Sequence, residues 1–225
     1  MSTRVRKEVE RVRDRVEHGD PFWPAQLAVA VAIALNFGLA ARLAVGPRWL
    51  LPGVELALLV ALVIVVPRRA TEHSRGRRTF ALCLIALVSL TSVASLGLLV
   101  HYLINGGAVG GHKLIMSGVL LWATNVLLFA VWYWEMDRGG PVNRFREDLQ
   151  PDFLFPQMDS PELAPKGWRP SFLDYLYTSL TNATAFSPTD TMPLTQTAKL
   201  VMAMQSITAL TTIALVVSRA VNILG

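Results

Sequence analysis

The chain has 225 residues, of which 52% are hydrophobic, and a formal net charge of +5. Its apolar residues fall into long runs, which is typical of membrane proteins and argues against an ordinary soluble domain. The positive charge is mostly arginine at the ends of these runs, without a basic surface interleaved with aromatic residues. We therefore expect the lipid bilayer as a partner and no binding of nucleic acid.

The N-terminal segment, residues 1–20, is predicted to form a cytoplasmic amphipathic helix. Within residues 2–18, four valines alternate with charges of both signs at spacings typical of one helix face: Val5, Val9, Val12 and Val16. Gly19 and Pro21 end this pattern. Two turns of valine bury little surface, so a short coiled coil, a helix on the membrane face and a helix resting on its own protein all remain open.

Five apolar runs are long enough to cross a hydrocarbon core of roughly 30 Å, and each should be helical because unpaired backbone groups are costly in lipid. We read the first run as a retained anchor, since a long charged segment precedes it. The first four runs make residues 21–136 a four-helix membrane region. The five predicted spans are residues 25–45, 50–66, 79–104, 113–134 and 199–223.

Arginine predicts the orientation of these spans. The loop between the second and third spans carries five arginines and should be cytoplasmic: Arg68, Arg69, Arg75, Arg77 and Arg78. The N-terminus and residues 137–170 should then also be cytoplasmic. We expect the protein to be located in the cell membrane. Trp132, Tyr133 and Trp134 at the end of the fourth span are predicted to form an interfacial aromatic belt.

Residues 137–170 are predicted to form a structured loop. This segment is rich in proline and mixed in charge, too polar to span a membrane and too interrupted for a long helix. Four apolar side chains are expected to attach it to the helix bundle: Phe153, Phe155, Met158 and Trp168.

The last unit, residues 171–225, carries regularly placed polar residues before and after a turn that lacks glycine. Asp174, Leu176, Tyr177 and Ser179 follow an acidic-x-Leu-Tyr-x-Ser order. Further on, Thr184, Asp190, Pro193, Thr195 and Lys199 fall at fixed spacings without a gap. This unit resembles the pore helix, filter and inner helix of the potassium-channel superfamily. The resemblance implies a re-entrant or interfacial helix near 171–186 and a homo-oligomer, a tetramer if the chain is channel-like.

The filter chemistry departs from that family. Its filter, Thr-x-Gly-Tyr/Phe-Gly-Asp, depends on glycine to aim successive carbonyl groups at one axis. Here Ser187 and Thr189 replace both glycines and Pro188 replaces the aromatic residue. A cage of carbonyls for dehydrated potassium is therefore not available. Either hydroxyl and carboxylate rings attract partly hydrated cations, or residues 187–190 are a turn that precedes the last helix.

The last span carries one polar stripe. Gln205, Thr208 and Thr212 are spaced three and four residues apart, which places them on one face of a helix that should avoid lipid. Such a stripe lines either a water-filled path or a helix contact held by side-chain hydrogen bonds.

The two orientation signals conflict. The arginine bias places residues 135–198 on the cytoplasmic side, whereas the potassium-channel filter faces outward. The pore-like unit is therefore either inverted in the membrane or a helical hairpin without a conducting role.

We expect no enzymatic activity, cofactor or metal. The chain contains no Gly-x-Ser-x-Gly motif, no phosphate-binding loop and no His/Cys cluster at metal-binding spacing. Its single cysteine, Cys83, lies within the third predicted span, so no intrachain disulfide can form.

These patterns predict an all-α fold: a polytopic helix bundle with five transmembrane helices and one re-entrant helix. The functional hypothesis is a channel-like protein that passes monovalent cations with weak selectivity through an oligomeric pore. Its ion path would use Thr184, Ser187, Thr189 and Asp190 at the constriction, and Gln205, Thr208 and Thr212 in the cavity. The alternatives are a non-conducting scaffold or partner-binding subunit, and a small-solute transporter.

Overall fold

The computed structural model describes residues 21–43, 53, 57, 60, 75–104, 111–141, 143–145, 149–184 and 190–224. The predicted N-terminal helix, residues 2–18, lies outside this part of the chain. Of the predicted second span, residues 50–66, only Gly53, Ala57 and Val60 are described; all three are helical and exposed.

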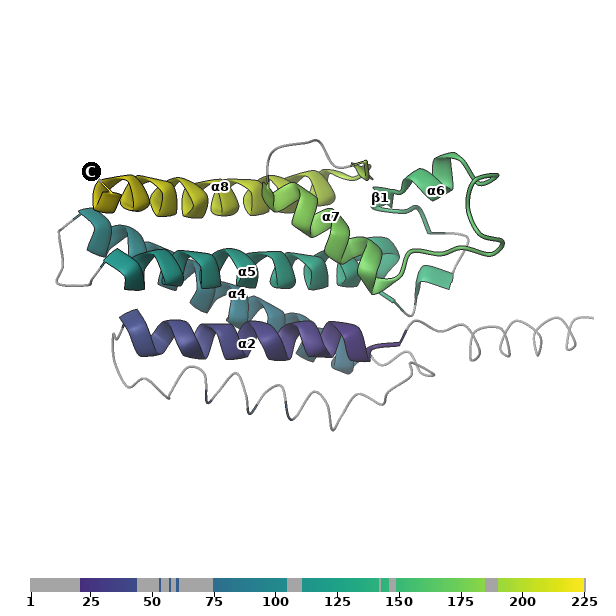
Figure 1. Cartoon of the computed structure of the whole chain (residues 1–225). Helices are drawn as coiled ribbons and strands as arrows, with labels where there is room; N and C mark the ends of the chain where they lie inside the picture. The colour runs from purple at the N-terminus through teal and green to yellow at the C-terminus, as the bar shows by residue number, and fades with distance from the viewer. Residues whose placement is uncertain are drawn as a thin grey trace, which may run out of the picture.

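Helices make up almost all of the regular structure, so the predicted all-α class is confirmed. The long helices are α2 (Trp23–Leu43), α4 (Arg75–Ile104), α5 (Gly111–Met136) and α8 (Gln196–Leu224), and the shorter α7 (Phe172–Thr184) precedes α8 (Figure 1). Three of the described helices are long and apolar enough to cross a membrane, in Arg78–His101, His112–Gly139 and Gln196–Ser218. In α2 the apolar stretch, Trp23–Asn36, is shorter.

Helix α5 lies at the centre of the bundle and contacts α2, α4, α7 and α8. The residues at the start of α2 and α4 lie beside its last turn. The ring of Phe22 contacts that of Trp134 with centroids 5.2 Å apart, and Arg78 donates a hydrogen bond to the carbonyl oxygen of Glu135 at 3.3 Å. Helices α2 and α4 therefore run antiparallel to α5.

Helix α8 also runs antiparallel to α5, on the opposite side from α2 (Figure 1). Its first residues approach residues 137–152 at the end of α5, whereas Val216 near its other end packs against Gly118. We call the end of the molecule that carries residues 137–170 and the first turns of α2, α4 and α8 the loop end. The chain enters α2, α4 and α8 from this one end.

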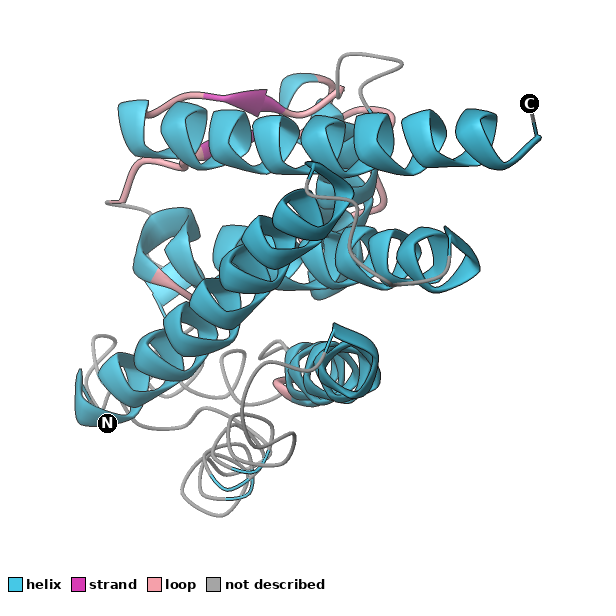
Figure 2. Ribbon diagram, turned by 90° about the vertical axis from the view of Figure 1, so that its left-hand side faces the viewer, coloured by secondary structure: helices cyan, strands magenta, loops and turns pink. Residues whose placement is uncertain are grey.

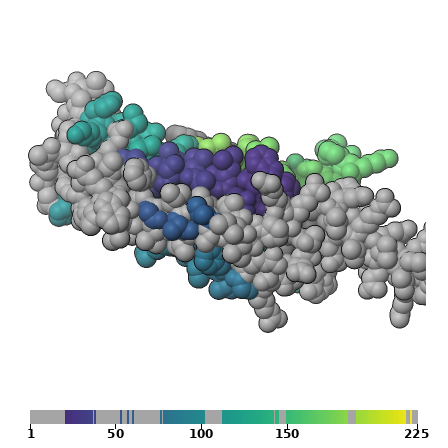
Figure 3. All heavy atoms as spheres, turned by 90° about the horizontal axis from the view of Figure 1, so that it is seen from below, coloured from purple at the N-terminus to yellow at the C-terminus, as the bar shows by residue number. Residues whose placement is uncertain are grey.

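The contact between α2, α4 and α5 is mostly apolar. Small and branched side chains of α2 are buried against the neighbouring helices, namely Ala25, Ala28, Val29, Ala32 and Ile33. Small residues allow two helix backbones to approach closely, which suits helices that pack within a membrane. The other face of α2 lies at the molecular surface (Figure 3) and exposes Trp23, Leu27 and Val31.

Helix α5 ends in a reversal of the chain. Arg138, Gly139 and Gly140 follow one another at φ of 52°, 74° and 101°, which glycine adopts readily and which stops the helix. The next elements are the short helices η1 (Asp137–Gly139), η2 (Asn143–Phe145) and α6 (Pro156–Asp159), with strand β1 (Phe153–Leu154) before α6.

Residues 137–170 are attached to the bundle as predicted. Phe153 and Phe155 are buried in the main hydrophobic cluster, and Met158 and Trp168 pack against it. Strand β1 also pairs antiparallel with β2 (Met192–Pro193), placing Phe153 opposite Pro193. The two short strands lie beside the start of α8 (Figure 2).

Candidate functional site

Helix α7 begins at the loop end with a side-chain cap. The backbone N–H and the hydroxyl of Ser171 both donate to Oδ2 of Asp174, at 2.7 and 2.8 Å. A serine before the first turn and an acid three residues later are a common helix start, and the carboxylate also favours the positive end of the helix dipole. Asp174, which the sequence pattern placed at the start of a pore helix, therefore has a local structural role here.

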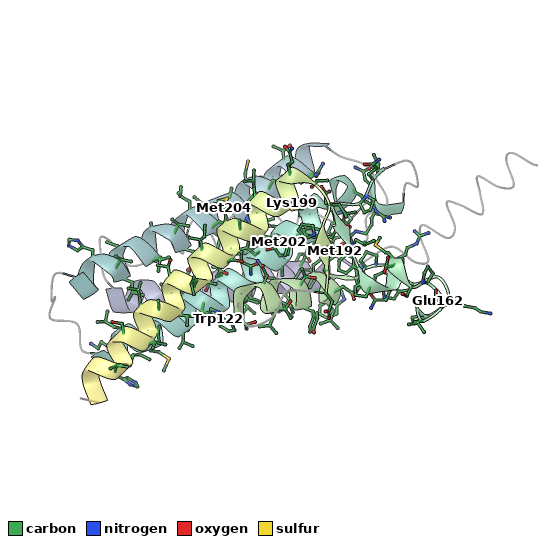
Figure 4. The ribbon with its side chains drawn as sticks, turned by 90° about the horizontal axis from the view of Figure 1, so that it is seen from above. Trp122, Glu162, Met192, Lys199, Met202 and Met204 are labelled. Atoms are coloured by element: carbon green, nitrogen blue, oxygen red, sulfur yellow. The ribbon has the colours of Figure 1, made fainter. Side chains whose placement is uncertain are left out.

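Helix α7 runs inward along α5 and stops near the middle of its length. At its start, the Tyr175 hydroxyl donates to Oδ2 of Asp137 at 2.6 Å, just beyond the end of α5. At its end, Trp122 Nε1 donates to the Ala183 carbonyl oxygen at 3.5 Å. Trp122, labelled in Figure 4, lies close to the midpoint of Gly111–Met136.

At the next described residues, which begin at Asp190, the chain is again at the loop end. Thr178 and Thr191 share a hydrogen bond of 3.1 Å between their hydroxyl groups. The next residues are fixed by Asp152: its carboxylate accepts the Thr195 hydroxyl at 2.6 Å, and its carbonyl oxygen accepts the Leu194 N–H at 2.8 Å. The first turns of α7 and α8 therefore both lie at the loop end.

The deepest polar contact between α5, α7 and α8 centres on Gln205. This side chain is fully buried. Its amide nitrogen donates to the carbonyl oxygen and the hydroxyl of Ser179, at 2.9 and 2.7 Å. Its amide oxygen accepts a hydrogen bond from Asn182 at 2.8 Å and another from the hydroxyl of Tyr133.

Asn182 and Ser179 connect this contact to more of the backbone. Asn182 Nδ2 also donates to the Met202 carbonyl oxygen at 3.0 Å, and its Oδ1 accepts the Ser206 hydroxyl at 3.1 Å. The Ser179 hydroxyl donates to the Val126 carbonyl oxygen of α5 at 2.7 Å. We call Tyr133, Ser179, Asn182, Gln205 and Ser206 the amide network. It joins α5, α7 and α8 by direct hydrogen bonds between side chains.

A second buried polar contact closes the loop end. Arg144 and Asp137 are both almost fully buried, with Nε and Oδ2 4.0 Å apart. The guanidinium group also donates to the carbonyl oxygens of Trp134 at 2.7 Å and Pro170 at 3.2 Å, and it lies 4.7 Å from the ring centre of Tyr175. Burying two charges is costly unless such partners compensate them, so this pair fixes residues 137–170 to the ends of α5 and α7.

The predicted path residues that the structure describes have different surroundings. Thr184 is the last residue of α7, with its hydroxyl on the Thr181 carbonyl oxygen, and Asp190 is exposed, while Ser187 and Thr189 lie outside the described residues. Gln205 faces the interior of the chain. The sequence left two roles open for the polar stripe on α8, and Gln205 has the second: it forms a helix contact held by side-chain hydrogen bonds.

The two threonines of the same stripe use their own helix. Thr212 is buried and Thr208 is half-buried. Their hydroxyls donate to the carbonyl oxygens of Thr208 and Met204, each at 2.8 Å. Neither contributes a side-chain hydrogen bond to another described helix.

The predicted aromatic belt is wrong for two of its three members. Tyr133 and Trp134 are fully buried in the core instead of lying at a membrane interface. Successive helix residues point about 100° apart, so three adjacent aromatics face different surroundings. Only Trp132 stays half-buried, and its Nε1 donates to the Ser89 hydroxyl at 3.0 Å.

Sequence reasoning missed the roles of Tyr133, Asp137, Arg144 and Asp152. One signal was present: a tyrosine within an apolar run needs a hydrogen-bond partner, and the last span offers a glutamine. Among the described residues, no group of three or more His, Cys, Asp or Glu side chains is arranged to hold a metal ion.

Comparison of the chain with protein-family models, curated proteins and solved structures yields no match.

Proposed function

We propose that the chain is an integral membrane protein with five spans and a re-entrant helix, α7. Three described helices have the length and composition of spans. Helices α2 and α4 both start at the loop end, which suits a further crossing between them in the predicted span 50–66. Helix α7 begins at the same end as Arg78, and arginine is enriched on the cytoplasmic side of membrane proteins. This supports a cytoplasmic position for the start of α7 and for the N-terminus.

Within this arrangement, α7, the turn that follows it and α8 act as an inverted pore-loop unit that passes monovalent cations in a homo-oligomer. The observation that carries the proposal is the end of α7 near the midpoint of α5, beside Trp122. The C-terminal end of a helix carries partial negative charge, which favours a cation inside a bilayer. Thr184, Ser187, Thr189 and Asp190 form the constriction, and half-buried Thr208 lies further along the path.

Cation flux into liposomes that contain the purified protein tests this function. We expect flux above that of empty liposomes, and a lower flux for Asp190→Ala. Glu162→Ala is the matched control, because Glu162 is another exposed carboxylate but lies on the loop that projects beyond the bundle (Figure 4). Protein-containing liposomes without flux across a range of voltage and pH contradict the proposal.

A non-conducting, partner-binding subunit is the second candidate. It is favoured by the amide network, which satisfies the polar groups of α7 and α8 within one chain. This candidate predicts a stoichiometric partner on purification and unchanged behaviour of Thr184→Ala and Asp190→Ala.

The side of the membrane on which the loop end lies is a separate test. Gln150 is exposed at this end. Gln150→Cys in a Cys83→Ser background should react with an impermeant thiol reagent only from the cytoplasmic side. Reaction from the outside contradicts the inverted orientation.

A further inference from the structure

Every hydrogen-bonding group of the Gln205 side chain is used within the amide network. An amide side chain has two N–H donors and two oxygen lone pairs, and here Ser179, Asn182 and Tyr133 occupy all four. A fully buried amide that lost these partners would be strongly disfavoured, because its side chain has no contact with solvent. The network is therefore stable only when the three helices meet in this arrangement.

The network also has one register. Ser179 and Asn182 lie one turn apart on α7 and face Gln205 and Ser206 on α8. If α7 moved outward by one turn, the residues four positions later, Ala183 and Phe186, would take the places of Ser179 and Asn182. Neither side chain offers a hydrogen bond, so the Gln205 amide would lose the side-chain partners that α7 supplies.

The contacts at the two ends of α7 agree with this register. Tyr175 reaches Asp137 at the loop end, and Trp122 reaches the Ala183 carbonyl oxygen at the inner end. Between them, the Ser179 hydroxyl reaches the Val126 carbonyl oxygen, about one turn of α5 from Trp122. Near the inner end of α7, the contact between Asn182 and Gln205 joins two amide side chains. An exchange of their lengths therefore keeps the chemistry and tests the geometry.

We propose that Asn182 and Gln205 are a positioning pair that sets how deeply α7 enters the membrane. Their contact fixes the depth of Thr184, the last residue of α7. This inference rests on the proposed re-entrant placement of α7, but it does not require conduction. It also gives Gln205 a role different from that of a residue lining an ion path.

The depth of α7 is measured with a cysteine at its last residue, Thr184→Cys, in the Cys83→Ser background. The protein is reconstituted in vesicles, and the reaction rate with an impermeant thiol reagent is compared with that of Gln150→Cys at the loop end. The reporter is then combined with Asn182→Gln, with Gln205→Asn, and with both. Each single change lengthens or shortens one amide, whereas the double change exchanges them.

We expect each single change to alter the Thr184→Cys rate by about tenfold, the scale set by the loss of one hydrogen bond between side chains. The double exchange should restore most of the original rate. Tyr133→Phe, which removes a single hydroxyl from the same network, should give a smaller change. Thr211→Val is the control and should change nothing, because the exposed Thr211 donates to Ile207 of its own helix.

Two results overturn the positioning pair: single changes that leave the rate unaltered, and a double exchange as altered as the singles. A Thr184→Cys that reacts as fast as Gln150→Cys in the otherwise unchanged background contradicts the re-entrant placement itself. Vesicles without cation flux contradict the channel alone, since the labelling rates are read independently of conduction.

Discussion

The two sides of helix α5 are packed by different chemistry. On one side, α2 and α4 bury alanine and branched aliphatic side chains such as Ala28, Ala32 and Val88. On the other side, α7 and α8 meet α5 through Tyr133, Ser179 and their hydrogen-bonded partners. The amide network thus lies on the same side as the helix that does not cross the bundle.

The difference follows from what each kind of contact can specify. Apolar contact is non-directional and grows with buried area, which suits helices that run the full length of α5. Helix α7 has 13 residues and less area to offer, and hydrogen bonds between buried polar groups fix a single register. The comparison predicts that substitutions on the polar side, between α5, α7 and α8, shift the position of α7. Substitutions on the apolar side, between α5, α2 and α4, should weaken only the packing.

The largest effect should come from the buried ion pair at the base of the polar side. Arg144→Met leaves the Asp137 carboxylate buried without its countercharge, for which a loss of about 3–5 kcal/mol in unfolding free energy is typical. Chemical denaturation in detergent measures it. Lys166→Met, which removes an exposed cation from the same loop, should cost almost nothing. Equal losses for the two variants would show that Arg144 is not a specific anchor.

The positions of the long helices along the sequence were predictable because each depends on local composition. The predicted spans 79–104, 113–134 and 199–223 end within four residues of α4, α5 and α8. Uninterrupted apolar runs favour helix in lipid wherever the partners lie, so no knowledge of packing was needed.

The interior of the polar side was not predictable in the same way. Tyr133 and Gln205 are 72 residues apart in the chain, and Arg144 and Pro170 are 26 apart. Hydrophobic periodicity shows that Gln205 avoids lipid but does not identify its partner. The stripe therefore fitted a water-filled path and a helix contact equally until Ser179 and Asn182 were placed beside it.

A smaller effect is expected where Gly118 of α5 packs against Val216 of α8. A Cβ on Gly118 would lie 2.1 Å from Cγ2 of Val216, so Gly118→Val forces the two helices apart. Overpacking of this kind costs about 1–3 kcal/mol. Gly97→Val is the matched control, because a Cβ on Gly97 of α4 meets no atom within 4 Å. If both variants melt at the same temperature, α8 does not depend on this close approach.

Two asparagines, half-buried Asn182 on α7 and buried Asn36 on α2, compare the sides directly. The amide nitrogen of Asn182 has three acceptors at 2.8–3.2 Å, whereas that of Asn36 on α2 reaches Thr91 and Ser92 only at 3.3–3.4 Å. Asn182→Leu leaves partners unsatisfied and should cost about 1–3 kcal/mol, while Asn36→Leu should cost less than about 1 kcal/mol. Denaturation of the two variants side by side measures the difference, and the reverse order would remove the distinction between the sides.

The smallest effects should come from the threonines of α8. Because the hydroxyls of Thr208 and Thr212 donate only to carbonyl oxygens of their own helix among the described residues, replacement by valine breaks no contact between helices. Both valine variants should stay within about 0.5 kcal/mol of the unchanged protein. They should differ in function, since half-buried Thr208 lies on the proposed path and buried Thr212 does not. Flux measurements on the two variants should show a change for Thr208→Val alone, and a change for Thr212→Val alone would mean that α8 faces the path with its buried side.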